Sequence, residues 1–167
     1  MKYLVVIDMQ NDFIDEALGS SDAEAIVEKV KNKIETFDGE IVYTRDTHYE
    51  NYMDTQEGKF LPVPHCIKGS HGWEITDKIP VNGIVFDKPT FGSEELGRYL
   101  KEKSPESVEL IGLDTDICVI SNAMLIKAFM PEVPVLVDAS CCAGTSKENH
   151  QQALNVMEIC QIIVEGE

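Results

Sequence analysis

A cysteine, a carboxylate and an ammonium group each follow an apolar run of the chain. Cys118 comes after the run 109–113 and a short polar turn, and a helical pattern begins at it. Free N–H groups and the dipole at a helix N-terminus favour the thiolate, which is the reactive form of cysteine. Asp8 ends the run 4–7, and Lys88 follows the run 83–87. Because a carboxylate can accept the thiol proton and an ammonium can stabilise charge, the three predict a cysteine hydrolase.

Each of these residues has a simpler explanation when it is taken alone. A free cysteine is usually a small buried hydrophobic residue, and an aspartate at a strand end is often a turn residue. The hypothesis therefore depends on their joint occurrence. Asp114 and Asp116 oppose it, because nearby carboxylates raise the pKa of a thiol. Asp116 is better explained as a helix cap.

A second group of residues has the chemistry of metal ligands. Asp46 and His48 stand two residues apart at the end of a strand, so their side chains point the same way. Glu57 and His65 follow downstream. Two imidazoles and one or two carboxylates suit a catalytic divalent metal, zinc first, with iron or manganese as alternatives. The competing explanation is an acidic surface loop that carries histidines, and we give His71 and Cys66 weaker claims as ligands.

Charge and composition exclude several classes of protein. The 167 residues carry a formal net charge of −16, which argues against binding to nucleic acid or to an anionic membrane. No apolar run reaches the length of about 20 residues that a membrane span needs. The chain starts with a strand pattern rather than a signal peptide, so we expect a cytoplasmic protein with five reduced cysteines. We predict a single domain over residues 1–167.

Short apolar runs alternate with helical patterns, which is typical of a three-layer α/β fold with a parallel sheet. Ser21 with Glu24 and Thr145 with Glu148 predict capping boxes. The long segment 46–80 interrupts the alternation, and segments of that kind are usually functional or disordered. The predicted strands are 3–8, 40–45, 83–87, 107–112, 133–138 and 160–164, and the later predicted helices are 93–103, 117–130 and 146–158.

Ligands of open parallel sheets bind beyond the carboxyl ends of the strands. Asp8, Asp46, Lys88 and Cys118 lie at or just past such ends, and Asp138 is expected at another. The other cysteines have weaker claims to a function. We expect Cys160 in a core strand and the pair Cys141-Cys142 in a turn, with a redox role of this pair as a third alternative function.

Five segments together resemble the isochorismatase-like cysteine hydrolases, and within them the nicotinamidase (pyrazinamidase) branch. The segments occur in family order and cover nearly the whole chain, and the metal segments point to the branch. The matching segments are 6–13, 44–48, 64–70, 87–92 and 112–119.

The resemblance implies a Rossmann-like sheet of six parallel strands in the order 3-2-1-4-5-6, with helices on both faces. It implies homo-oligomers and a metal that binds the pyridine nitrogen of the substrate. It also implies a cis peptide bond at Leu113–Asp114. The implied site residues are the triad Asp8, Lys88 and Cys118, the metal ligands Asp46, His48, His65 and Glu57, the oxyanion-binding N–H groups of Asp114 and Cys118, and the ring-binding walls Phe13, Phe91 and Phe60 or Leu61.

The predicted activity is hydrolysis of nicotinamide to nicotinate and ammonia through a thioester. The nearest alternative is another hydrolase of the superfamily, which acts on an N-carbamoyl or other small amide or on isochorismate. The alternative from another class is a non-catalytic scaffold that binds a metal or a ligand.

Overall fold

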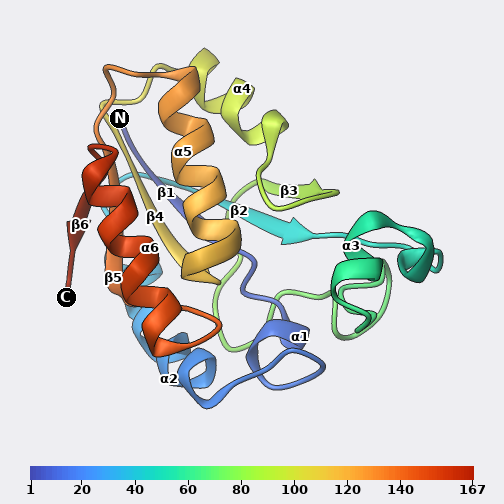
Figure 1. Cartoon of the computed structure of the whole chain (residues 1–167). Coiled ribbons are helices and arrows are strands. Elements are labelled where there is room, and N and C mark those ends of the chain that lie inside the picture. Colours follow the sequence, from blue (N-terminus) through green and yellow to red (C-terminus); the bar gives the residue numbers. More distant parts are fainter.

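The computed structural model describes residues 1–167 and contains one sheet of six parallel strands (Figure 1). The strand order is β3-β2-β1-β4-β5-β6, as the family resemblance implied. The strands are β1 (Lys2–Ile7), β2 (Glu40–Asp46), β3 (Val85–Lys88), β4 (Ser107–Leu113), β5 (Val135–Ala143) and β6 (Ile163–Glu165).

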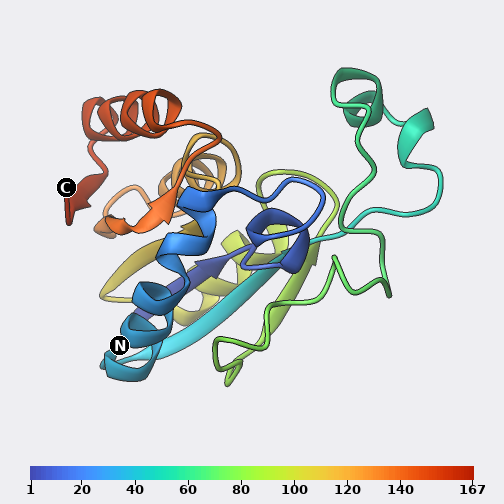
Figure 2. The same cartoon turned by 90° about the horizontal axis from the view of Figure 1, so that it is seen from below.

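Helices cover both faces of this sheet and make the predicted three layers. α2 packs on one face, and α4, α5 and α6 pack on the other (Figures 1 and 2). The helical elements are α1 (Asn11–Ile14), α2 (Ser21–Thr36), the 3-10 turn η1 (Tyr52–Asp54), α3 (Gln56–Phe60), α4 (Glu94–Lys103), the π-helical turn η2 (Thr115–Val119), α5 (Ile120–Phe129) and α6 (Lys147–Ile159). None of them combines the length and the apolarity that a membrane crossing requires.

The central strand β1 explains why the sequence pattern was easy to interpret. Leu4 and Val6 enter the apolar cluster beneath α2, whereas Val5 and Ile7 enter the cluster beneath α4, α5 and α6. All four side chains are buried. A strand that is covered on both faces needs apolar residues at every position, so it shows a continuous apolar run rather than an alternation.

The predictions for the C-terminal third were wrong in several places. Asp138 does not end a strand, because β5 continues to Ala143 past a register shift against β4. Lys33 of α2 pairs with Asp138 at 2.7 Å, which explains a charged residue inside the strand. Cys141 and Cys142 therefore lie buried in β5 and not in a turn. Cys160 is partly exposed at the end of α6, since β6 begins only at Ile163.

Two helices are capped by the residue next to the predicted one, one residue earlier for α2 and one residue later for α6. Ser20, not Ser21, caps α2 by accepting a hydrogen bond from the N–H of Ala23 at 3.0 Å. Ser146, not Thr145, caps α6 by accepting from the N–H of Asn149 at 3.0 Å. Adjacent hydroxyl residues can serve equally well as N-caps, so sequence alone does not choose between them.

Residues 47–67, which we call the arm, stand away from the sheet in both views (Figures 1 and 2). The arm contains η1 and α3 and returns to its own starting point. At that point the N–H of His48 donates to the carbonyl of Cys66, and the N–H of Lys68 donates to that of His48, both at 2.9 Å. The long segment without periodicity is therefore ordered, and its two ends are hydrogen-bonded beside the sheet.

Candidate active site and metal centre

The carboxyl ends of four neighbouring strands bring the predicted site residues together. Asp8 directly follows β1, Asp46 and Lys88 are the last residues of β2 and β3, and Cys118 lies in the η2 turn after β4. These four strands are adjacent in the order β3-β2-β1-β4. The convergence predicted from the strand ends is therefore what the structure contains.

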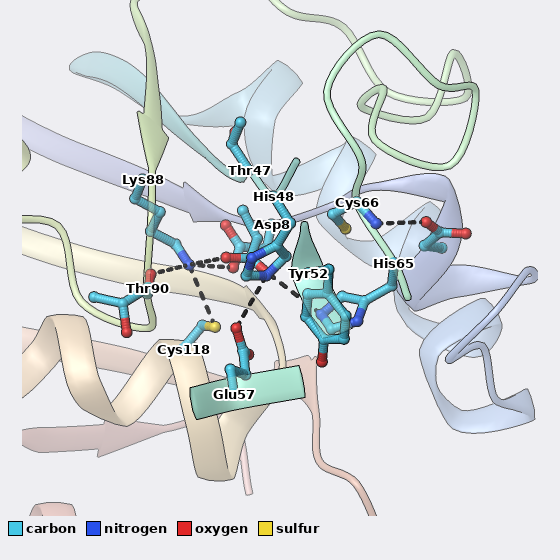
Figure 3. Close-up of polar contacts among 12 residues, drawn as sticks. Asp8, Thr47, His48, Tyr52, Glu57, His65, Cys66, Lys88, Thr90 and Cys118 are labelled. Atoms are coloured by element: carbon cyan, nitrogen blue, oxygen red, sulfur yellow. Dashed lines mark hydrogen bonds and ion pairs between the residues drawn. The ribbon is translucent and has the colours of Figure 1, made fainter. Parts of the chain in front are cut away.

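Of the three residues predicted to be catalytic, Lys88 contacts both of the others (Figure 3). Its Nζ lies 2.7 Å from Asp8 Oδ2 and donates a hydrogen bond of 3.4 Å to Cys118 Sγ. It also donates to the carbonyl of Thr90 at 3.1 Å. Asp8, Lys88 and Cys118 are all buried, so water screens these interactions little.

The two carboxylate oxygens of Asp8 have different surroundings. Oδ1 accepts a hydrogen bond of 2.7 Å from the hydroxyl of Thr44. Oδ2 forms the ion pair with Lys88, and no other donor reaches it. One oxygen is therefore fixed in place, whereas the other has a lone pair free for a proton.

The thiol does not have the lowered pKa that we expected from a helix start. Burial raises the pKa of Cys118 well above its usual value, and the charge of Asp8 adds to this, although Lys88 opposes the rise. Burial also raises the pKa of Asp8. Burial alone would lower the pKa of Lys88, but the charge of Asp8, together with that of Asp46, holds it above its usual range. We conclude that the resting thiol is neutral and needs a base.

The turn around Cys118 differs from a simple helix N-terminus. Cys118 lies inside the π-helical turn η2, and the α-helix α5 starts only at Ile120. Asp116 does not cap this helix; its carboxylate accepts hydrogen bonds from the N–H and the hydroxyl of Thr145, at 2.8 and 2.6 Å. The peptide bond Leu113–Asp114 is cis, as the family resemblance implied.

The predicted metal ligands form one compact group. The ligand atoms of Asp46, His48, Glu57 and His65 all lie within 4.8 Å of one another. His48 Nε2 is 2.8 Å from Asp46 Oδ2 and 3.2 Å from Glu57 Oε2, and His65 Nε2 is 3.5 Å from Asp46 Oδ2. Asp46 comes from β2, and the other three come from the arm. Glu57, which was the least certain member of the set in the sequence, belongs to this group.

The donor set fits a divalent cation. Asp46 Oδ1 is buried without a hydrogen-bond partner, and Lys88 Nζ is 3.6 Å away from it. Hydrogen bonds from His48 and His65 outweigh burial and hold the pKa of Asp46 below its usual range, so this carboxyl is ionised. Two imidazole nitrogens and two carboxylates match the ligand types of zinc and of similar divalent metals. An ionised carboxylate whose Oδ2 faces both imidazoles is what a bound cation would satisfy.

Gln10 and Tyr52 support the ligands, and sequence reasoning missed both as site residues. The side chain of Gln10 accepts from the N–H of Asp46 at 2.7 Å and donates to its carbonyl at 2.8 Å. It also donates to the carbonyl of Trp73 at 2.8 Å. The ring of Tyr52 packs edge-on against His48 and His65, with centroids 5.0 and 5.1 Å apart. Gln10 stands two residues after the predicted base Asp8, and this spacing could have identified it as a site residue. No feature of the sequence marks Tyr52.

A cavity of about 970 Å³ opens beside the thiol and the ligand group. Cys118, Asp46, Glu57 and His65 all line it, and so do Phe13, Phe60 and Phe91. Phe13 is buried against His65, whereas Phe91 and Phe60 on the arm are exposed, Phe60 to 83%. The structure thus places the three predicted ring-binding residues around one cavity.

The weaker candidates lie apart from the ligand group. His71 is exposed and pairs with Glu16 at 2.7 Å. His150 lies in α6 and its Nδ1 is 2.6 Å from the hydroxyl of Thr115. Cys66 is buried, and its N–H donates to Asp12 at 2.7 Å. None of the three joins the ligand group.

Comparison with known proteins gives one consistent result. A family model described as the isochorismatase domain matches residues 2–166. The nicotinamidase/pyrazinamidase of Mycobacterium tuberculosis is 25% identical over 97% of each chain. The structure of a pyrazinamidase of Pyrococcus horikoshii in complex with zinc superposes with a TM-score of 0.84, at 27% identity over 98% of this chain and 97% of that one. An N-carbamoylsarcosine amidase from Thermoplasma acidophilum superposes with a TM-score of 0.82, at 30% identity over 98% and 95%.

Proposed function

The chain belongs to the isochorismatase family, and we propose that within this family it is a metal-dependent nicotinamidase that works through a Cys118 thioester. It is an amidohydrolase, a hydrolase of carboxamide C–N bonds. The observation that carries the proposal is one cavity bordered by both Cys118 and the Asp46, His48, Glu57 and His65 group.

In the first half-reaction Asp8 acts as the base. The pKa of Cys118 is raised, so the thiol must lose its proton as it attacks, and Asp8 Oδ2 has a lone pair free to accept it. The sulfur bonds to the carboxamide carbon, and the carbonyl oxygen becomes an oxyanion. The N–H groups of Asp114 and Cys118 are proposed to stabilise this oxyanion. Asp8 then gives the proton to the nitrogen, and the C–N bond breaks to release ammonia.

In the second half-reaction Asp8 takes a proton from water as the oxygen attacks the thioester carbon. The C–S bond breaks, the carboxylic acid product forms, and the sulfur regains a proton from Asp8. Lys88 remains charged throughout, since surrounding negative charges raise its pKa. Its contacts with Asp8 and Cys118 allow it to stabilise the negative charge on whichever of the two carries it.

Asp46, His48, Glu57 and His65 would hold one divalent metal, with zinc first and iron or manganese as alternatives. When bound, the metal would supply positioning of a substrate that carries a ring nitrogen, and positioning can lower a barrier by several kcal/mol. Phe13 and Phe91 would flank the ring, with Phe60 as an outer wall. Phe13 is already held by its contact with His65.

The first experiment measures ammonia release from nicotinamide by the purified protein, before and after chelation, with metal content determined on the same sample. We expect release that stops on chelation and returns when metal is added. Cys118→Ala protein with full turnover would contradict the mechanism, and release that persists without metal would contradict the metal assignment.

The second candidate is hydrolysis of an N-carbamoyl or other small amide. The similarity to the N-carbamoylsarcosine amidase favours it, and a cavity of about 970 Å³ has room for a substrate larger than nicotinamide. A panel of small amides and N-carbamoyl amino acids separates the two candidates by their kcat/KM values. The expected homo-oligomer, cytoplasmic location and single domain stay predictions from the sequence.

A further inference from the structure

A buried amide side chain connects the turn that carries Cys118 with the segment that carries Phe91. Asn122 lies in the first turn of α5, four residues after Cys118, and is fully buried. Its Nδ2 donates hydrogen bonds to the carbonyls of Cys118 at 2.8 Å and of Phe91 at 3.0 Å. Its Oδ1 accepts from the N–H of Ser93 at 2.9 Å. The partners are two carbonyls and one N–H group, so only one orientation of the amide satisfies all three.

The segment 88–93 has two reasons to need such an anchor. It carries Lys88 and Thr90, which contact each other beside the thiol, and Phe91, which lines the cavity. It also lies directly on α5, because a Cβ added at Gly92 would be 3.3 Å from Leu125 Cδ2. The segment ends at Ser93, whose hydroxyl caps α4.

We propose that Asn122 is a positioning residue that sets the place of Phe91 relative to Cys118, and so fixes how a substrate ring lies against the nucleophile. The side chain does not line the cavity and so acts through the two backbone carbonyls that it holds. The predicted effect of Asn122 on substrate binding rests on the proposed function. The predicted effect of Asn122 on the backbone of the segment does not.

The structural test needs no substrate. Asn122→Ala removes all three hydrogen bonds, whereas Asn122→Asp keeps an oxygen for the N–H of Ser93 and loses the two donors. We expect hydrogen exchange at the N–H of Ser93 to be at least about tenfold faster in Asn122→Ala than in Asn122→Asp. Ile126→Ala is the matched control, since Ile126 is buried on the same helix one turn further along. Equal exchange at Ser93 in Asn122→Ala and wild type, with both folded, would overturn the proposal.

The kinetic test asks whether Asn122 acts through Phe91. We expect Asn122→Ala to raise KM for nicotinamide on the order of tenfold, and to have little further effect on KM in a Phe91→Ala background. Ile126→Ala should lower stability and leave KM unchanged. A merely structural role of Asn122 predicts the same unchanged KM for Asn122→Ala, and that result would refute positioning.

The two tests separate the failure of this inference from the failure of the proposed function. A wild-type protein that does not hydrolyse nicotinamide contradicts the proposed function alone. In that case the exchange measurement still decides whether Asn122 anchors the segment, and the KM comparison is made with the amide that the wild type hydrolyses best.

Discussion

Asp8, Lys88 and Cys118 lie at the ends of three strands, whereas His48, Glu57 and His65 are carried by the arm. The first group is buried at the carboxyl ends of the strands, and direct contacts to Lys88 hold it together. The second group is held by a loop whose ends pair with each other where His48 meets Cys66 and Lys68. Asp46 at the end of β2 is the one residue that contacts both groups. The comparison suggests that the nucleophilic chemistry and the metal site can be disabled separately.

The strongest test of this separation is Cys118→Ala. Without the thiol no thioester forms, so we expect kcat/KM to fall by at least about 10⁴-fold. Because Cys118 is not a metal ligand, we also expect metal affinity, measured by competition with a chelator, to stay within about threefold of wild type. A large loss of metal affinity in this variant would show that the two groups do not act separately.

His48→Ala disables the metal site and leaves the nucleophile in place, the opposite of Cys118→Ala. Loss of an outer-shell partner of a metal site typically costs about 10–100-fold in affinity, so loss of a ligand should cost more than about 100-fold. Glu57→Gln, which keeps the shape of the side chain but removes its charge, should cost less. The thiol should still react with iodoacetamide at a rate near that of wild type, as read for the Cys118 peptide by mass spectrometry. A thiol that became unreactive in His48→Ala would contradict the separation.

Asp114 lies near the catalytic residues at the carboxyl ends of the strands, and the pH dependence of stability tests its environment. Burial, with the charges of Asp116 and Asp8, raises the pKa of Asp114 to about 7. An unfolded aspartate titrates near pH 4, so ionisation costs the native state stability as the pH rises from about 4 to 7, by up to about 4 kcal/mol. Asp114→Asn removes this cost. We expect urea unfolding to show the variant gaining on wild type across this pH range and levelling off above it.

The matched control for Asp114 is Asp54→Asn on the arm, at an exposed position. The raised pKa of Asp114 predicts a larger pH-dependent gain for Asp114→Asn than for this control. Equal pH trends in the two variants would contradict the assignment of a raised pKa to Asp114.

Tyr52→Phe should give the smallest effect. The change removes the hydrogen bond of 2.8 Å from the Tyr52 hydroxyl to the carbonyl of Leu61, but keeps the ring against both histidines. We expect a loss of about 1 kcal/mol in the free energy of unfolding and little change in metal affinity. Tyr52→Ala, which removes the ring as well, should weaken metal binding clearly. Equal metal affinities in the two variants would mean that the ring does not support the ligands.

The residues at the carboxyl ends of the strands were predictable from sequence, because buried parallel strands have continuous apolar runs. The first polar residue after each run marks the end of the strand. That rule located Asp8 directly, and it placed Asp46 and Lys88 within two residues of the ends of their runs. It was wrong at Asp138, where Lys33 of a distant helix compensates a charge inside β5. A pairing between residues so far apart in sequence leaves no local pattern.

The arm was less predictable, since its residues follow no helical or strand period. The chemistry of its ligands could be inferred from residue type, but the supporting ring of Tyr52 could not. Local pattern also overstated the effect of a helix start on Cys118, because burial outweighs backbone N–H groups when the whole side chain is dry. Asn122 was missed for a similar reason: a lone amide in an apolar helix gives no sign of the carbonyls that it will meet.

The position of Trp73, whose carbonyl accepts a hydrogen bond from Gln10, has a practical consequence. Trp73 is the single tryptophan of the chain. Its indole N–H donates to Thr47, next to Asp46, at 2.9 Å, and the guanidinium of Arg45 lies 3.5 Å from its ring centroid. Indole emission responds to nearby charge, so the protein carries its own optical reporter beside the ligand group. We expect metal uptake and loss to be followed in real time by intrinsic fluorescence, without a label.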